Sequence, residues 1–309
     1  MGHLKLTRAK TIPTPMSYNM NMNYDVWADW QINFFCNFRC EYCFSKSDGR
    51  KENPEFNGCS VERITAGFDR TNLVWLLHMS GGEPFLHPKF VELCRRLTRR
   101  HFISLNSNIS TCNVYEFAEQ IGSERVAFVH CSLHFDERVR LGLIEDFIAK
   151  YHFLEKRGFN VFATQVLYPP ILSRFNRIFK FFLNRGIVIK PKIFRGSYNQ
   201  RCYPTSYTEA ERAKILGFFR FSKDTEWIDI HLVDGNLSFK GLPCGAGSVF
   251  VMIGYDGNVT RCTGEPIGLG NVFDGHVLLL EHPEPCHVDI CPCPYYGLQY
   301  AEVDASRVA

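Results

Sequence analysis

Short apolar runs alternate with longer amphipathic stretches over residues 24–196. The apolar runs that predict strands are 26–35, 72–79, 101–106, 125–134, 159–167 and 186–194. The longest helical pattern between them spans 137–156 and stops at Gly158. Its apolar positions recur at helical spacing: Leu141, Ile144, Ile148, Tyr151 and Leu154. Six strand-helix repeats predict an α/β fold with a parallel sheet, curled into a partial or full barrel.

Alternation within the first and last strands predicts a polar interior. Asp29, Gln31 and Asn33 share one face of the first strand, because successive side chains of a strand point to opposite faces. Lys190 and Lys192 share the inward face of the last strand. We expect these faces to line a cavity that holds a polar ligand. The alternative is two edge strands, each with a solvated face.

The pattern changes after Gly196. A segment at 197–243 is expected to be a linker with a helix at 209–221, capped near Ser206 or Thr208. Turn signals at 234–235 and 256–257 then punctuate short β-rich runs, the second within a hairpin. We therefore expect four parts along the chain: an N-terminal extension (1–23), a barrel (24–196), this linker and a small second domain (244–309).

Composition and charge narrow the function classes. The 309 residues carry a net charge of +3, which is too balanced for sequence-independent binding of nucleic acid. No apolar run approaches the roughly 18 residues that span a bilayer, and no secretory signal is evident. The 13 cysteines are an odd number in a chain too long to need disulfides. They indicate reduced thiols in a cytoplasmic protein, with metal or redox chemistry.

Three cysteines stand close together directly after the first predicted strand. They are Cys36, Cys40 and Cys43, in the pattern CxxxCxxC. Three thiolates in one tight loop can bind three irons of a 4Fe-4S cluster and leave the fourth iron open. A structural zinc site would need a fourth ligand, and the nearest further cysteine, Cys59, is not at a CxxC spacing.

This loop resembles that of the radical S-adenosylmethionine (radical SAM) superfamily, in which CxxxCxxC follows the first strand of a partial (β/α)6 barrel. Tyr42 fills the aromatic position that the family places before the third cysteine. The family's GGEP motif, which contacts the amino group of S-adenosylmethionine, is matched after the second strand by Ser80, Gly81, Gly82, Glu83 and Pro84. Glycines allow a close approach of backbone to ligand, and Glu83 would supply a counter-charge for an ammonium group.

Further site residues follow from strand order. Asn106 lies where the family often has a TNG-like element, from which LNSN departs, and Ser132 matches a serine that contacts the cofactor. His134 is a candidate acid or base, because its ordinary pKa lies near neutrality. Lys190 and Lys192 are the other candidate catalytic residues, from their predicted inward position.

A second group of cysteines lies near the C-terminus. Cys244 and Cys262 form the pattern CX12GX4C, which resembles the start of the SPASM and twitch extensions of radical SAM proteins; Cys286, Cys291 and Cys293 follow. The resemblance implies an auxiliary 4Fe-4S cluster. The five thiols exceed the four ligand positions of such a cluster by one, and the sequence leaves open which of Cys286, Cys291 and Cys293 is not a ligand. A zinc ribbon is the alternative.

The resemblance implies a specific chemistry. The first cluster takes an electron from a reductase such as flavodoxin or ferredoxin and cleaves S-adenosylmethionine, and the 5′-deoxyadenosyl radical then takes a hydrogen atom from a substrate. Only about 20 residues precede the first strand, fewer than a recognition domain needs. This favours a small molecule or a peptide presented by a separate protein. We expect oxidation or bond formation on a small polar molecule such as a sugar or aminocyclitol. The alternatives are a maturase of a ribosomally made peptide and a non-catalytic zinc or iron-sulfur protein.

Overall fold

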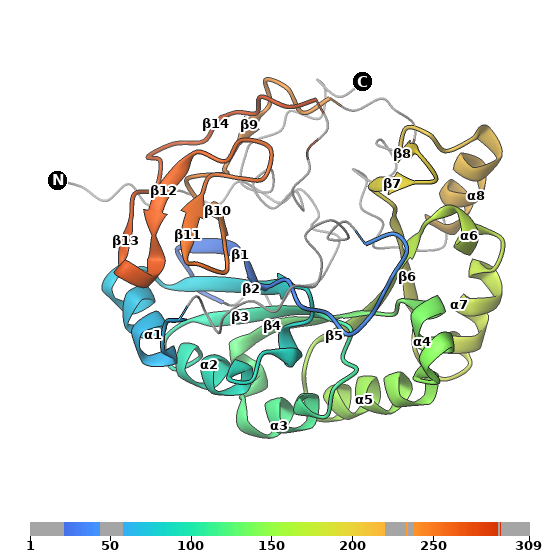
Figure 1. Cartoon of the computed structure of the whole chain (residues 1–309), viewed down its shortest axis with the longest axis horizontal. Coiled ribbons are helices and arrows are strands. Elements are labelled where there is room, and N and C mark those ends of the chain that lie inside the picture. Colours follow the sequence, from blue (N-terminus) through green and yellow to red (C-terminus); the bar gives the residue numbers. More distant parts are fainter. Residues whose placement is uncertain (1–21, 44–57, 220–232, 234–237, 290, 292–309) are drawn as a thin grey trace.

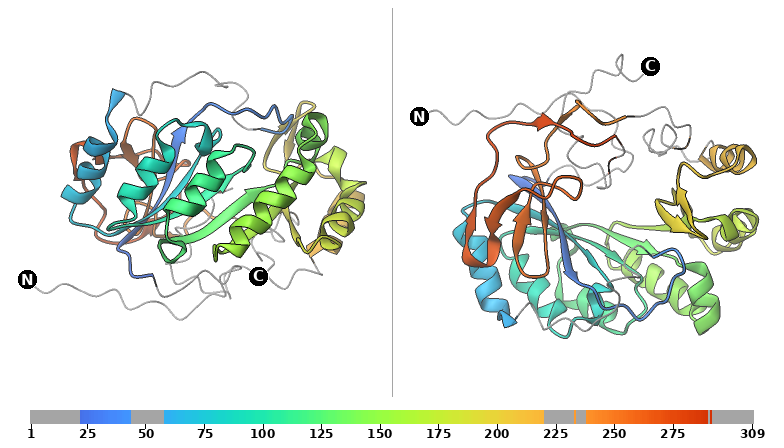
Figure 2. Two further views of the ribbon diagram at one scale, coloured as in Figure 1. Left: turned by 90° about the horizontal axis from the view of Figure 1, so that it is seen from below. Right: turned by 45° about the horizontal axis from the view of Figure 1, so that its top comes forward.

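A ten-stranded sheet is the centre of the fold. The computed structural model describes residues 22–43, 58–219, 233, 238–289 and 291. The strands of the large sheet run in the order β13-β12-β11-β10-β1-β2-β3-β4-β5-β6. Figure 1 shows this sheet as an arc with helices along its outer side, and Figure 2 shows the same arrangement from two further directions.

The first six strands form the barrel-like part that the sequence pattern predicts. All six are parallel neighbours in sequence order: β1 (Val26–Asn33), β2 (Trp75–Gly81), β3 (Phe102–Ser107), β4 (Val126–Ser132), β5 (Val161–Leu167) and β6 (Ile189–Ile193). The connecting helices are α1 (Val61–Arg70), α2 (Phe90–Leu97), α3 (Asn113–Gln120), α4 (Phe135–Leu141), α5 (Ile144–Lys156), α6 (Pro169–Leu172) and α7 (Phe175–Leu183). The predicted α/β class and partial barrel are therefore confirmed.

The helix expected at 137–156 is wrong, because two helices occupy this stretch. Gly142 ends α4 in the left-handed region, with φ +69°, and α5 begins at Ile144. Glycine adopts this conformation without steric cost, so it can stop a helix within a continuous apolar pattern. Leu141, which the pattern assigns to the apolar face, is 40% exposed as a result.

The C-terminal strands extend the sheet of the barrel. β10 (Phe250–Ile253) runs parallel to β1, and β11 (Asn258–Thr260) returns from it as the predicted hairpin. The remaining elements of this part are β9 (Pro243–Cys244), β12 (Gly268–Asn271), η5 (Val272–Asp274), β13 (His276–Val277) and β14 (Glu284–Pro285). Trp30 Nε1 of β1 donates to the carbonyl oxygen of Gly254 at 3.2 Å. The sheet is thus continuous across the expected boundary at residue 244.

The segment between the barrel and these strands contains a short hairpin and a helix. The hairpin is β7 (Gly196–Tyr198) with β8 (Arg201–Tyr203), and the helix is α8 (Glu209–Phe219). Thr208 Oγ1 accepts from the backbone N–H of Glu211 at 3.3 Å, so Thr208 is the cap that the sequence left undecided. The turn expected at 234–235 lies outside the described residues. Across the described ranges, no helix is long and apolar enough to cross a membrane.

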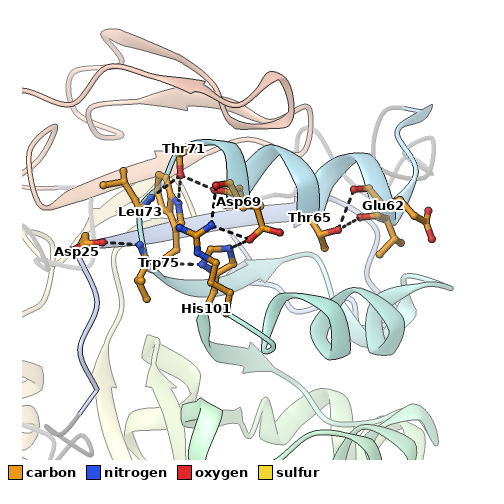
Figure 3. A network of polar contacts seen from close by, with 12 residues as sticks. Asp25, Glu62, Thr65, Asp69, Thr71, Leu73, Trp75 and His101 are labelled. Atoms are coloured by element: carbon orange, nitrogen blue, oxygen red, sulfur yellow. Dashed lines mark hydrogen bonds and ion pairs between the residues drawn. The ribbon is translucent and has the colours of Figure 1, made fainter.

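Polar contacts tie the amino ends of the first strands together (Figure 3). Asp25 Oδ2 accepts from the backbone N–H of Val74 at 2.7 Å, just before β1 and β2 begin. The indole Nε1 of Trp75 donates to Thr71 Oγ1 at 2.9 Å, and the backbone N–H of Trp75 donates to His101 Nδ1 at 3.4 Å. This edge is closed by structural contacts, which leaves the opposite, carboxyl edge for the site.

Candidate active site

The three cysteines of the first motif lie in the loop that leaves the carboxyl end of β1. Cys40 is buried, whereas Cys36 and Cys43 are half-buried. The backbone N–H of Phe38 donates to Cys36 Sγ at 3.4 Å, and that of Cys43 donates to the carbonyl oxygen of Cys40 at 3.2 Å. The loop is therefore turned back on itself, with its thiols on a compact stretch of backbone.

The two glycines after β2 bring that strand against the start of the cysteine loop. The backbone N–H of Gly82 donates to the carbonyl oxygen of Asn33 at 2.9 Å, and that of Glu83 donates to the carbonyl oxygen of Phe35 at 2.7 Å. A Cβ on Gly81 would lie 2.4 Å from the Asn33 carbonyl oxygen. We expected the glycines to admit a ligand, but the atoms that crowd them here belong to the protein backbone.

The carboxylate of Glu83 joins the end of β2 to the end of β3. It accepts from Ser107 Oγ at 2.6 Å, from the backbone N–H of Asn108 at 2.6 Å and from that of Phe85 at 3.1 Å. The side chain is buried, and burial raises the pKa of its carboxyl group. Both oxygens thus already have donors within the chain, and the expected role of this residue as a counter-charge stays a proposal.

Two residues that the sequence analysis missed complete this layer. Asn108 Nδ2 donates to Asn37 Oδ1 at 3.0 Å and lies 3.9 Å from Cys36 Sγ. Arg138, fully buried, donates through Nε to the carbonyl oxygen of Leu133 at 2.7 Å and through Nη2 to that of Asn108. Its guanidinium lies 5.3 Å from the ring centre of Phe38, and burial lowers its pKa to about 10. Asn108 and Arg138 therefore support the cysteine loop through their contacts with Asn37, Cys36 and Phe38.

Asn106 and Ser132 lie side by side at the ends of β3 and β4. Ser132 Oγ donates to Asn106 Oδ1 at 2.8 Å. Tyr42 and His134 form a second pair, with Tyr42 Oη 2.7 Å from His134 Nδ1 and ring centres 5.9 Å apart. Burial lowers the pKa of His134 to about 3, so its imidazole is neutral near pH 7. The pKa near neutrality on which its candidate acid-base role rested is not retained in this environment.

The inner face of the barrel carries the polar residues that strand alternation predicts. Ser80 Oγ donates to Asp29 Oδ1 at 3.0 Å. Burial raises the pKa of Asp29 to about 6, against the opposing effects of the Ser80 hydrogen bond and the charge of Lys192. Lys190 Nζ lies 5.7 Å from the ring centre of Phe162, on the neighbouring strand. The structure therefore brings the first and last strands to one polar interior.

Two buried histidines of this interior were not singled out from the sequence. His78 Nδ1 is 2.9 Å from Ser104 Oγ, and His130 Nε2 is 2.6 Å from Thr164 Oγ1. Burial lowers the pKa of His78 to about 3 and that of His130 well below its ordinary value. The alternation of side chains along the two strands, LLHMS and FVHCS, was the available signal, because it places each histidine on the same face as the serine two residues later.

A second group of thiols lines a pocket in the C-terminal part. Cys244, Cys262 and Cys286 line it together with Arg261 and His287, among others. Cys291 is buried but is not part of this lining; its carbonyl oxygen accepts from Arg195 Nη1 at 3.2 Å. Cys293 lies outside the described residues. Three of the five expected ligands are thus brought to one place.

Both groups present cysteine thiols, the donors that iron-sulfur clusters take. Among the described residues, no three His, Cys, Asp or Glu side chains stand close enough to hold one metal ion. A 4Fe-4S cluster takes one thiolate per iron and so accepts thiols that are further apart. Burial raises the pKa of Cys36 to about 11 and that of Cys40 to about 12. A positive metal centre beside them would favour their thiolate forms.

Comparison with known proteins finds a family match within the barrel. Residues 30–171 match the family described as the Radical SAM superfamily. A curated relative, the mycofactocin maturase MftC of Mycobacterium tuberculosis, is 27% identical over 94 residues, which are 29% of this chain and 24% of the relative. The match thus spans about a quarter of that relative's length.

Solved structures share the fold over a longer stretch. A structure of anSMEcpe with bound AdoMet and a peptide is 19% identical, with a TM-score of 0.55, and the match covers 81% of this chain and 78% of that one. Streptococcus suis SuiB bound to its precursor peptide SuiA is 12% identical, with a TM-score of 0.54 over 82% and 63% of the two chains. Residues 30–171 thus match the Radical SAM superfamily, an enzyme class that uses a 4Fe-4S cluster and S-adenosylmethionine, and the solved structures share the fold.

Proposed function

We propose that this radical SAM enzyme modifies a peptide: it cleaves S-adenosylmethionine and takes a hydrogen atom from a C–H bond of the peptide. One observation carries the first half of the proposal. The cysteine loop after β1, the glycines after β2 and Asn108 after β3 meet at the carboxyl edge of the parallel sheet, joined by the hydrogen bonds described above.

The residues of this edge are assigned separate tasks in the proposal. Cys36, Cys40 and Cys43 hold the cluster. The cofactor-binding set is Tyr42, Ser80, Gly81, Gly82, Glu83, Pro84, Asn106 and Ser132. When bound, the cluster supplies the electron that cleaves S-adenosylmethionine to methionine and a 5′-deoxyadenosyl radical. Lys190 and Lys192 of β6 then face the substrate from within the barrel, where they orient its polar groups.

The comparisons favour a peptide over the small molecule that the sequence analysis placed first. One relative is named a maturase, and two of the similar structures were solved with a bound peptide. We propose the peptide-maturase alternative as the function and place the sugar or aminocyclitol reading second.

The C-terminal part is proposed to be a twitch-like domain (244–309) behind a radical SAM barrel (24–196). The support is the pocket that Cys244, Cys262 and Cys286 line, within strands that continue the barrel sheet. We propose that these three thiols hold an auxiliary 4Fe-4S cluster, with a fourth ligand from the trailing segment.

The test begins with protein reconstituted anaerobically with iron and sulfide, and reduced with dithionite or a flavodoxin system. We expect 5′-deoxyadenosine and methionine from S-adenosylmethionine. Protein that binds zinc or iron but forms no 5′-deoxyadenosine would show a non-catalytic metal protein instead. Co-expression with a short peptide encoded beside the gene, followed by mass spectrometry, should then reveal a mass change in the peptide. An unchanged peptide together with turnover of an aminocyclitol would favour the small-molecule reading.

A further inference from the structure

Three separate segments supply the thiols of the C-terminal pocket. Cys244 ends β9, Cys262 follows β11, and Cys286 directly follows β14. β9 and β14 pair as antiparallel strands, with Glu284 opposite Cys244. The segment that carries Cys262 lies outside this pairing, so some other contact must hold it against the other two.

Arg261 makes that contact. Its side chain is 2% exposed. Nε donates to the carbonyl oxygen of Ala246 at 3.1 Å, two residues after Cys244. Nη2 donates to the carbonyl oxygens of Glu284 and Pro285, each at 3.2 Å, directly before Cys286. Because Arg261 also precedes Cys262 in the chain, one guanidinium joins all three segments.

The fourth contact of the guanidinium fixes the turn after Cys262. Arg261 Nη1 forms an ion pair with Glu265 Oε2. The backbone N–H of Glu265 donates to Cys262 Sγ at 3.2 Å, so this turn also places a donor on the sulfur. His287 Nδ1 lies 3.7 Å from the other carboxylate oxygen of Glu265. The ion pair therefore connects the orientation of the Cys262 thiol to the rest of the pocket.

Only arginine has the donors for this arrangement. Its planar guanidinium presents five N–H groups in a fixed fork, whereas a lysine ammonium is a single point with three donors. A buried charge is costly unless it is paired and hydrogen-bonded, and Arg261 is both. A residue that served only as a surface ion pair would be exposed, as Arg63 and its partner Asp274 are at about 60% each.

We propose that Arg261 is a positioning residue that assembles the C-terminal thiol pocket before any metal binds. The thiols are held by hydrogen bonds within the protein, so the cluster would enter a prepared site. The expected effect on metal binding rests on the proposed auxiliary cluster. The role of Arg261 in assembling the metal-free pocket does not depend on that cluster.

The experiment uses full-length protein in which Cys36, Cys40 and Cys43 are replaced by Ala, so that only the C-terminal site binds iron. In this background, R261Q should lose the cluster to a chelator at roughly 10–100 times lower chelator concentration, as expected when supporting contacts of a metal site are removed. R63Q is the matched control, because Arg63 of α1 makes an exposed ion pair with Asp274 of η5 in the C-terminal part. It should retain iron and sulfide like its parent.

Hydrogen exchange of the metal-free proteins provides the second readout. R261Q should raise exchange in segments 244–247, 262–265 and 284–288, whereas R63Q should not. R261K keeps the charge and most of the packing, and we expect intermediate protection; it also decides the question if R261Q does not fold. Parental protection and parental cluster retention in R261Q or R261K would overturn the proposal. A parent that binds no iron and sulfide would instead refute the auxiliary cluster, and the exchange comparison would still test Arg261.

Discussion

A Cβ atom on Gly82 would lie 2.0 Å from the carbonyl oxygen of Phe35, a separation that no side chain allows. Phe35 directly precedes Cys36, and its carbonyl oxygen accepts the backbone N–H of Glu83 at 2.7 Å. The glycine therefore decides how closely the second strand approaches the cysteine loop. Gly82 thus serves a backbone contact within the protein itself.

Gly82→Ala should push the cysteine loop away from β2. We expect a loss of about 1–3 kcal/mol of stability, the usual cost of an overpacked contact, together with weaker binding of the first cluster. Urea unfolding and iron content in a Cys262→Ala background measure the two effects. Gly217→Ala in α8 is the control, since no atom outside its own helix backbone and chain neighbours lies within 4 Å of the added Cβ. Unchanged stability and iron binding in Gly82→Ala would contradict the crowding argument.

Replacement of Cys36, Cys40 and Cys43 together by Ala should abolish cleavage of S-adenosylmethionine. The wild type should hold about eight irons in two clusters, and the triple variant about four. The spectrum of the remaining cluster should persist, because its ligands lie in another part of the chain. Formation of 5′-deoxyadenosine by the triple variant would refute the assignment of the first site. Four irons in the wild type, with zinc in the second site, would refute the auxiliary cluster.

Cys262→Ala should separate hydrogen abstraction from product formation. If the auxiliary cluster accepts an electron from the substrate radical, its loss leaves 5′-deoxyadenosine formation intact while oxidised product falls. Loss of a metal ligand can also unfold a small metal-dependent part, so circular dichroism must first show an intact barrel. With deuterated substrate, the wild type should transfer deuterium into 5′-deoxyadenosine. Normal oxidation by the variant would mean that the cluster does not accept the electron.

The buried His78 should make the protein less stable in acid. Its pKa is about 3 in the folded protein and near 6.5 when unfolded, so between these values only the unfolded chain takes up the proton. Stability should therefore fall as the pH drops from 6.5, by about 1.4 kcal/mol per pH unit for this one group. His78→Asn removes the titration, so the stability difference between parent and variant should shrink between pH 6.5 and pH 5. An equal difference at both values, in urea unfolding, would mean that His78 titrates normally.

Gly67→Ala should loosen the contact between α1 and the C-terminal strands. The new Cβ would lie 2.3 Å from the carbonyl oxygen of Val272 and 2.9 Å from Phe273 Cα. Both are backbone atoms of η5, which cannot move without shifting the neighbouring strands. We expect a loss of about 1–3 kcal/mol and faster hydrogen exchange in residues 268–277. Exchange that matches the wild type there would show that η5 is not held by this contact.

Local patterns determined the fold class and pointed to the candidate first site. The spacing of Cys36, Cys40 and Cys43 and the motif from Ser80 to Pro84 are each complete within a few residues. Strand alternation likewise placed Asp29 and Lys192 inside, because the period of two is a property of the backbone itself. The sequence analysis did not predict that Gly142 divides the helical pattern at 137–156 into two helices. Periodicity alone does not distinguish a glycine within a helix from one that ends it.

Tertiary structure decided which residues support the site. Glu83 and Ser107 meet across 24 positions of the chain, Arg138 and Asn108 across 30, and Arg261 and Pro285 across 24. None of these pairs has a periodic or spacing signal, because each depends on the packing of separate strands and loops. Burial likewise lowers the pKa of His134, whose residue type alone indicates a pKa near neutrality. Desolvation is a property of the folded surroundings, and only the three-dimensional structure contains it.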